Sequence, residues 1–143
     1  MSKNELDPAL IEAPYPLQAH LGFDIVDWRA DFCRLEQPML PHLMNRYGIP
    51  HGGLHATLLD TAMGFATCFT GDPEVRKLVM TLSMTVNFMA VSNGKLLIAE
   101  GRRVGGGRST AFAEGIVRDD TGTTIATATG VFRYRNPQSG EKT

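Results

Sequence analysis

The segment from Gly52 to Thr70 most constrains the fold, because it has the pattern of a long helix without an ordinary solvent face. Apolar residues recur along it at steps of three and four, which is the period of one helix face. The opposite side carries small residues and Asp60, where a surface helix would carry lysine and glutamate. This small-residue stripe consists of Gly53, Thr57, Asp60, Gly64 and Thr67. We therefore predict a helix that is covered on both sides.

The same segment approaches the roughly 20 residues that a membrane-spanning helix needs. Asp60 lies near its centre, however, and a central carboxylate is costly in lipid. We interpret the segment as a helix buried in protein and expect no membrane partner.

Charge and cysteine content exclude several other classes of protein. Fourteen basic and fifteen acidic residues give a formal net charge of −1, so no charge excess favours nucleic acid. The two cysteines, Cys33 and Cys68, are too few for a disulfide framework or a zinc cluster. The start of the chain, Met1–Pro8, is polar and lacks the pattern of a secretory signal. We expect a cytoplasmic protein with reduced thiols.

Most of the remaining apolar residues predict strands. The clearest is Met80–Phe88, where apolar and polar residues alternate. Five further strands are predicted at Phe23–Trp28, Phe32–Gln37, Lys95–Val104, Ser109–Asp119 and Thr123–Arg135. Short separators with turn-forming residues favour antiparallel pairing. We predict an α+β fold in which a curved antiparallel sheet wraps around one long central helix.

The sequence indicates one domain, at residues 20–136. Residues 1–19 contain three prolines and no clean period, so we expect an extension that is irregular or forms a short helix. Residues 137–143 are polar, and we expect a flexible tail there.

Two features near the start of the central helix could carry chemistry. His51, Gly52 and Gly53 form a glycine-rich entry, and the first N–H groups of a helix can stabilise a developing oxyanion. Asp60 has no lysine or arginine one turn away on the helix, which favours a reactive over a structural carboxylate. A plain entry turn and a structural carboxylate remain alternatives.

Spacing relates these two features. Gly52 and Asp60 lie roughly 12 Å apart along one helix, so one small reacting group cannot contact both. If they serve one site, two helices must run side by side in opposite directions. A two-fold dimer supplies that arrangement, and the small-residue stripe would permit the close approach.

The spaced residues Asn45, Gly48, His51, Gly52, Gly53 and Asp60 resemble the signature of hot-dog-fold acyl-CoA thioesterases of the PaaI type. The likeness continues through Val86–Met89, Gly101–Arg103 and Ile125–Gly130, and covers roughly residues 20–135. It implies a hot-dog fold and hydrolysis of an aryl- or medium-chain acyl-CoA to free acid and CoA. It implies no cofactor beyond the CoA of the substrate, no metal, and a homodimer or a homotetramer.

The resemblance also assigns roles by position. The Gly52 N–H would polarise the thioester carbonyl, and Asp60 of the facing subunit would act as general base or nucleophile. Asn45 and His51 would shape the site. Thr81 matches a position near the attacking water, and Ser83 is expected beside it on the same strand face.

Further residues are expected to contact the substrate. These are Gly53, Ser83, Asn87 and Phe88, with Gly106, Gly107 and Arg108 near the CoA phosphates. For the last three, an ordinary glycine-rich hairpin turn is the alternative.

Other functions remain to be weighed. A non-catalytic acyl-CoA-binding protein would keep the Gly52 turn without needing Asp60. A hot-dog hydratase or dehydratase usually has histidine five residues after the aspartate, where this chain has Phe65. A zinc site at His51 and His55 lacks an evident third ligand, and Cys68 lacks a histidine partner for thiol catalysis.

Overall fold

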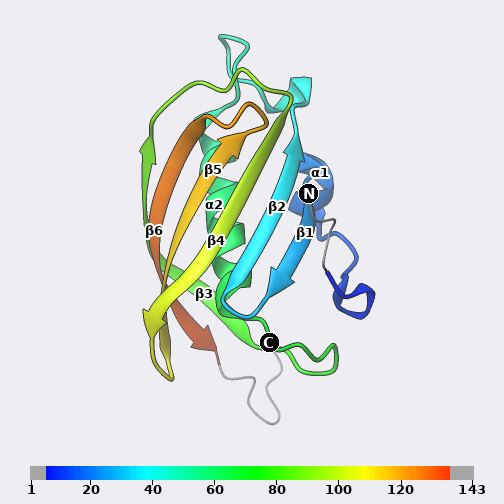
Figure 1. Ribbon diagram of the computed structural model, residues 1–143, viewed down its shortest axis with the longest axis vertical. Helices are drawn as coiled ribbons and strands as arrows, with labels where there is room; N and C mark the ends of the chain where they lie inside the picture. Colours follow the sequence, from blue (N-terminus) through cyan, green and yellow to red (C-terminus); the bar gives the residue numbers. More distant parts are fainter. Residues whose placement is uncertain (1–5, 136–143) are drawn as a thin grey trace.

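A computed structural model describes residues 6–135 of the chain, so the expected tail at 137–143 lies outside the described residues. Six strands form one antiparallel sheet in the order β1-β2-β4-β5-β6-β3, and helix α2 lies across one face (Figure 1). The strands are β1 Asp24–Arg29, β2 Phe32–Pro38, β3 Leu78–Phe88, β4 Leu96–Gly106, β5 Thr110–Asp119 and β6 Thr124–Arg135. The helices are α1 Pro16–Leu21 and α2 Gly52–Thr67, with 3₁₀ turns η1 Pro8–Leu10 and η2 Pro41–Leu43.

The predicted strands are all present, with ends that differ by at most two residues. The long helix ends at Thr67 instead of Thr70, because the chain leaves helical geometry at Cys68, whose N–H bonds back to the Phe65 carbonyl. Helix α1 ends at Leu21, and its C-cap Gly22 adopts a positive φ of 89° that glycine tolerates without strain.

Helix α2 packs closely onto the middle of the sheet. Leu58, Leu59 and Met63 on its inner face are fully buried. Beneath them Gly101 of β4 pairs with Gly115 of β5. A Cβ atom on Gly101 would collide with the Ala62 carbonyl group and lie 2.6 Å from the Met63 nitrogen. Glycine at this position therefore lets the helix backbone rest directly on β4.

The opposite side of α2 is not covered by residues 6–135. Gly53 is exposed, and Thr57, Asp60 and Gly64 are partly exposed, whereas Thr67 at the end of the stripe is buried. The predicted second cover for the small-residue stripe is therefore absent from the described part of a single chain.

Strand β3 lies at one edge of the sheet and is also open. Met80, Leu82 and Phe88 are 47%, 55% and 59% exposed. A long apolar edge strand is a template for pairing with another chain. The uncovered stripe and the open edge thus lie at the same side of the molecule, since α2 and β3 contact each other.

The single long helix against a curved antiparallel sheet is the hot-dog arrangement, and the predicted fold class is confirmed (Figure 1). No helix between Leu6 and Arg135 combines the length and apolar character needed to cross a membrane.

Candidate active site

The turn before α2 is held by its own polar side chains. The Asn45 Oδ1 atom accepts hydrogen bonds from the N–H groups of Tyr47 at 2.8 Å and Ile49 at 3.4 Å. His51 is the N-cap of the helix, and its Nδ1 atom accepts the Gly53 N–H at 2.7 Å. Asn45 and His51 therefore fix the entry to the helix, as an Asx turn and an N-cap do.

These contacts leave only one of the first two N–H groups of the helix free. The Gly53 N–H is occupied by His51, whereas no acceptor within residues 6–135 takes the Gly52 N–H. Gly52 is the first residue of α2, so its N–H lies at the positive end of the helix dipole. Gly52 is thus the donor available to an incoming oxygen.

Aromatic rings line this donor. A Cβ atom on Gly52 would lie 3.3 Å from Cε1 of Phe88, so the ring packs directly against the glycine. The ring of His55 lies 6.5 Å from that of Phe88 between centroids. Burial, and secondarily the charge of His51, lower the pKa of His55, so its imidazole is neutral near pH 7.

Asp60 and Thr81 form a hydrogen-bonded pair in one chain. The Thr81 hydroxyl donates to Oδ1 of Asp60 at 2.7 Å, which joins the middle of α2 to β3. No described residue bonds to the other carboxylate oxygen, Oδ2. The pair is therefore an oriented carboxylate with one oxygen free, on the uncovered side of the helix.

Ser83 does not share this site, and the expectation that it lies on the same strand face as Thr81 is wrong. Thr81 pairs with Phe132 of β6, but Ser83 pairs with the next residue, Val131, because β3 bulges at Leu82. Adjacent residues of a strand point to opposite faces, so Ser83 points away from α2.

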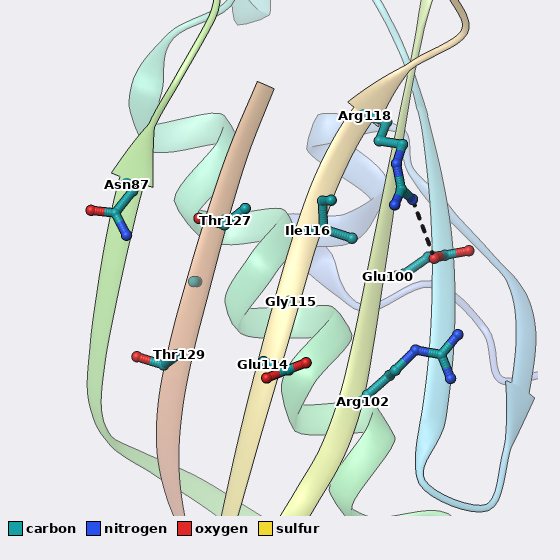
Figure 2. Close-up of a pocket in the computed structure, with 10 residues that line it drawn as sticks. Asn87, Glu100, Arg102, Glu114, Gly115, Ile116, Arg118, Thr127 and Thr129 are labelled. Atoms are coloured by element: carbon teal, nitrogen blue, oxygen red, sulfur yellow. Dashed lines mark ion pairs between the residues drawn. The ribbon is translucent and has the colours of Figure 1, made fainter. Parts of the chain in front are cut away.

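Asn87 also lies on the outer face of the sheet. It pairs with Thr127, whereas its neighbour Phe88 pairs with the buried Ala126 and points toward α2. Asn87, Thr127 and Thr129 line a hollow of about 470 Å³ on the outer face of the sheet. Figure 2 shows these three side chains on β3 and β6. The structure therefore separates Asn87 from Phe88.

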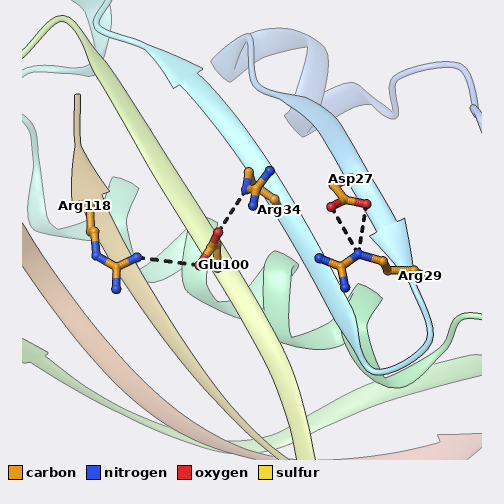
Figure 3. Close-up of polar contacts among 5 residues, drawn as sticks. All are labelled: Asp27, Arg29, Arg34, Glu100 and Arg118. Carbon is orange, nitrogen blue, oxygen red and sulfur yellow. Dashed lines mark hydrogen bonds and ion pairs between the residues drawn. The ribbon is translucent and has the colours of Figure 1, made fainter. Parts of the chain in front are cut away.

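The outer face near this hollow is a network of compensating charges. Glu100 accepts a hydrogen bond from Arg34 at 2.9 Å and lies 3.6 Å from Arg118, while Arg29 pairs with Asp27 on β1 (Figure 3). These carboxylates are neutralised by their partners, so they are poor candidates for acid–base chemistry.

The predicted phosphate-binding turn lies near the other end of α2. The Gly107 N–H closes the β4–β5 hairpin by donating to the Thr110 carbonyl at 2.8 Å, so it is not free for a phosphate. Gly106 has a positive φ of 123°, as such a turn requires. Gly107 and Arg108 instead line a hollow of about 490 Å³ that also contains Arg76, Lys77 and Arg103.

Gly52 and Asp60 are not brought together by a single chain. Both belong to α2, which is continuous from Gly52 to Thr67. They remain about 12 Å apart along its axis. A shared site therefore still requires a second, antiparallel copy.

The structure gives no support to a thiol nucleophile, a metal site or a hydratase histidine among the described residues. Burial raises the pKa of the Cys33 thiol and raises that of Cys68 to about 11. Both thiols are therefore protonated at neutral pH. Among the residues that the structure describes, no three metal-ligating side chains converge. Phe65, at the hydratase position, packs edge-on against Trp28 at 5.1 Å.

No sequence pattern pointed to Tyr15. Its hydroxyl lies 3.5 Å from the Thr61 hydroxyl, next to Asp60 in the helix. The preceding prolines hide this contact, since an irregular segment has no period to show which side chains face inward.

Comparisons with known proteins agree with this arrangement. The family model described as the thioesterase superfamily matches residues 47–126, which contain His51, Gly52, Asp60 and Thr81. No sequence among the curated proteins matches the chain.

Several solved structures are similar to the chain. A Bacillus halodurans protein solved with CoA is 27% identical, with 85% of this chain and 80% of that chain covered and a TM-score of 0.72. A thioesterase family protein from Silicibacter pomeroyi is 26% identical, with coverages of 84% and 89% and a TM-score of 0.74.

The Escherichia coli PaaI protein, from the phenylacetic acid degradation operon, has the same fold. It is 20% identical, with 84% of each chain covered and a TM-score of 0.73. The family match spans more than half of the chain and includes both halves of the candidate site. The chain therefore belongs to the thioesterase superfamily and shares the hot-dog fold of PaaI.

Proposed function

We propose that the chain hydrolyses an acyl-CoA thioester in a site built by two antiparallel copies, with Gly52 from one copy and Asp60 from the other. The observation that carries the proposal is that one helix bears both an unoccupied N–H at Gly52 and a carboxylate, Asp60, that is held by Thr81. Both lie on the side of α2 that residues 6–135 leave uncovered. The open edge strand β3 supports pairing with a second copy.

In this mechanism the Gly52 N–H donates to the thioester carbonyl oxygen, which gains negative charge when the carbonyl carbon is attacked. Asp60 of the partner subunit takes a proton from a water molecule, and the water oxygen forms the new bond to carbon. The C–S bond then breaks, the CoA thiolate leaves, and the proton on Asp60 passes to the sulfur. Thr81 keeps one carboxylate oxygen occupied so that the other faces the water.

A nucleophilic route uses the same groups. The Asp60 carboxylate would attack the carbonyl carbon itself, expel CoA and form an anhydride, which water then hydrolyses. Incubation in ¹⁸O-labelled water under single-turnover conditions separates the routes. Direct attack by water labels the released acid, whereas attack of water on the aspartyl carbonyl labels Asp60.

CoA recognition is proposed for the basic hollow of Arg76, Lys77, Arg103 and Arg108. In an antiparallel helix pair the C-terminal end of the partner's α2 extends past this chain's Gly52. The partner's basic hollow would then lie beyond Gly52, at the C-terminal end of the partner's α2. Cations at that place could bind the CoA phosphates. The CoA bound by the Bacillus halodurans relative supports this class of ligand.

The first experiment measures thiol release from short, long, aryl and hydroxylated acyl-CoAs. Asp60→Asn is expected to lower kcat by at least about 100-fold while CoA-ligand binding is retained. Glu114→Gln is the matched control, because it makes the same carboxylate-to-amide change at an exposed position on the outer face. Binding without turnover in the wild type would favour a non-catalytic acyl-CoA-binding protein.

The Gly52 donor can be removed without changing the rest of the turn. Gly52→Pro deletes the N–H at the first helical position, which proline favours, and His51 already has the extended backbone that precedes proline. Gly52→Ala is the matched control, because it adds a Cβ near Phe88 but keeps the N–H. We expect the proline variant alone to lose activity.

Mixing the two inactive variants tests whether the site is shared. A heterodimer of Asp60→Asn with Gly52→Pro contains one intact Gly52–Asp60 pair, so random mixing should restore about a quarter of wild-type activity. A site contained within one chain would show no recovery. Analytical ultracentrifugation of the same mixture would establish that the subunits had exchanged.

A further inference from the structure

His55 is a polar side chain on the buried face of α2. It is 5% exposed, and the residues that follow it on this face, Leu58, Leu59 and Ala62, are apolar and fully buried. No described residue forms a hydrogen bond with either ring nitrogen of His55, and its Nδ1 atom is fully buried. An unpaired buried polar atom destabilises a fold relative to an apolar side chain of the same shape. The presence of His55 in this row therefore points to a role other than packing.

Two other side chains of the described residues have a buried polar atom without a partner, and both have other roles. The amide nitrogen of Gln37 donates to the carbonyls of Leu21 at 2.7 Å and Pro38 at 2.9 Å, so only its oxygen is unpaired. Arg103 lines the basic hollow proposed for the CoA phosphates. Of these three side chains, His55 alone has neither a hydrogen bond nor a role in the proposed site.

The imidazole of His55 lies beside the Gly52 donor. His55 follows Gly52 by three residues, and residues at this spacing are neighbours on a helix surface. Helix side chains also tilt toward the N-terminus, which brings the imidazole toward the turn that contains Gly52. The Phe88 ring contacts both, since its Cε1 atom would lie 3.3 Å from a Cβ on Gly52 and its centroid lies 6.5 Å from that of His55. The imidazole and the Gly52 N–H therefore border the same space at the start of α2.

The protonation of His55 makes it a hydrogen-bond donor. Burial and the charge of His51 lower its pKa, so near pH 7 the ring is neutral and carries a single N–H. Nδ1 is fully buried, whereas Nε2 is unbonded but not fully buried. Because buried N–H groups without an acceptor are rarer than buried acceptors without a donor, the proton is assigned to Nε2. A neutral imidazole of lowered pKa can polarise a carbonyl group.

We infer that the Nε2–H of His55 is a second donor to the thioester carbonyl oxygen, beside the Gly52 N–H of the same subunit. This inference rests on the proposed thioesterase function. The next backbone donor, the Gly53 N–H, is bonded to His51, so a second hydrogen bond to the developing oxyanion has to come from a side chain. His55 keeps its proton throughout the reaction. The proton transfers from water to Asp60 and from Asp60 to sulfur are therefore unchanged.

His55→Leu separates a catalytic from a structural role, because leucine has a similar volume and no polar atom. We expect kcat to fall about 100-fold, as it does when one oxyanion donor is removed. The urea midpoint should stay the same or rise, since an unpaired buried polar group is lost. His20→Leu is the matched control, because His20 is exposed on α1 and should leave kcat unchanged. A wild-type kcat in His55→Leu would overturn the inference.

Two amide variants test which ring nitrogen is the donor. The amide nitrogen of glutamine can occupy the place of Nε2, whereas the shorter asparagine reaches only the place of Nδ1. His55→Gln should therefore be at least tenfold more active than His55→Leu, and His55→Asn should be no more active than His55→Leu. Recovery by asparagine and not by glutamine would overturn the assignment to Nε2.

The carbonyl stretch of bound octanoyl-CoA, labelled with ¹³C at the thioester carbonyl, reports the hydrogen bond without turnover. Infrared difference spectra are recorded with Asp60→Asn, since a donor to the carbonyl oxygen lowers its stretching frequency. Adding His55→Leu to this variant should raise the frequency, and adding His20→Leu should not.

These spectra also separate the inference from the proposed function. An unchanged frequency in the His55→Leu protein would overturn the inference even if kcat falls. If the wild type binds octanoyl-CoA but hydrolyses no acyl-CoA, the hydrolytic function fails, while a frequency that depends on His55 would still support the donor. If octanoyl-CoA does not bind, both fail.

Discussion

Gly101→Ala is the substitution whose effect the structure predicts most directly. The added methyl group would meet the Ala62 carbonyl group and approach the Met63 nitrogen to 2.6 Å, and both belong to the backbone of α2. No side-chain rotation can relieve this contact, so the helix must move away from β4. We expect the free energy of unfolding to fall by about 3 kcal/mol, the upper end of the usual cost of overpacking.

Two other glycines supply a graded comparison. A Cβ atom on Gly115 would meet the flexible side chains of Leu59 at 3.0 Å and Met63 at 3.2 Å, and would lie 3.3 Å from the backbone oxygen of Glu100. We expect Gly115→Ala to cost about 1 kcal/mol, since these side chains can shift a few tenths of an ångström. Gly107 has nothing within 4 Å of its Cβ position, so Gly107→Ala should stay within about 0.5 kcal/mol of the wild type.

Urea denaturation of the four proteins measures these differences. The midpoints should fall in the order Gly107→Ala, Gly115→Ala, Gly101→Ala with similar slopes, since the surface exposed on unfolding is the same. Gly101→Ala should also lower the rate of acyl-CoA hydrolysis. Asp60 lies two residues before Ala62, and a 1 Å displacement of a reacting group can cost roughly 100-fold in rate. A Gly101→Ala protein as stable as Gly107→Ala would refute the close approach of α2 to β4.

Three further predictions concern single side chains. Thr81→Val should lower kcat about 10- to 100-fold, because the Thr81 hydroxyl orients the Asp60 carboxylate through a hydrogen bond. Thr81→Ser keeps a hydroxyl and should retain most of the wild-type kcat. Asp119 accepts five hydrogen bonds, above all from the Thr121 hydroxyl, which hold its pKa below the usual value. Its stabilising effect is therefore complete above about pH 4 and is lost as the pH falls further. Asp119→Asn should cost about 2 kcal/mol at pH 7 and progressively less in acid, as followed by urea unfolding at each pH. Because burial raises the pKa of Cys68 to about 11, iodoacetamide at pH 8 should label it on the order of a hundredfold more slowly in the folded protein than in urea, as mass spectrometry would show. Rapid labelling of the folded protein would contradict that burial.

Local patterns determined much of the fold. The steps of three and four in Gly52–Thr70 and the alternation in Met80–Phe88 identified the helix and its neighbouring strand. The resemblance singled out Asn45 and His51, and the structure shows that each bonds to backbone N–H groups nearby in sequence, as side chains that cap turns and helices do. Residues with local partners are the ones that sequence spacing describes well.

The sequence predicted less well on which face of a strand a residue lies. Alternation placed Ser83 beside Thr81, but the bulge at Leu82 put them on opposite faces. A bulge depends on how β3 and β6 pair across some fifty residues of chain, and the sequence of β3 has no signal for it. The same pairing register separates Asn87 from Phe88.

The chemistry of the site divides in the same way. The sequence by itself determined that α2 would carry a glycine donor at its start and one carboxylate on a small-residue stripe, because those positions follow from spacing along one helix. Only the tertiary structure decided that Thr81 reaches Asp60 and that the N-terminal segment lies over Trp28 and Phe65. These contacts join segments with no common period, so they exist only once the sheet has formed and packed against the helix.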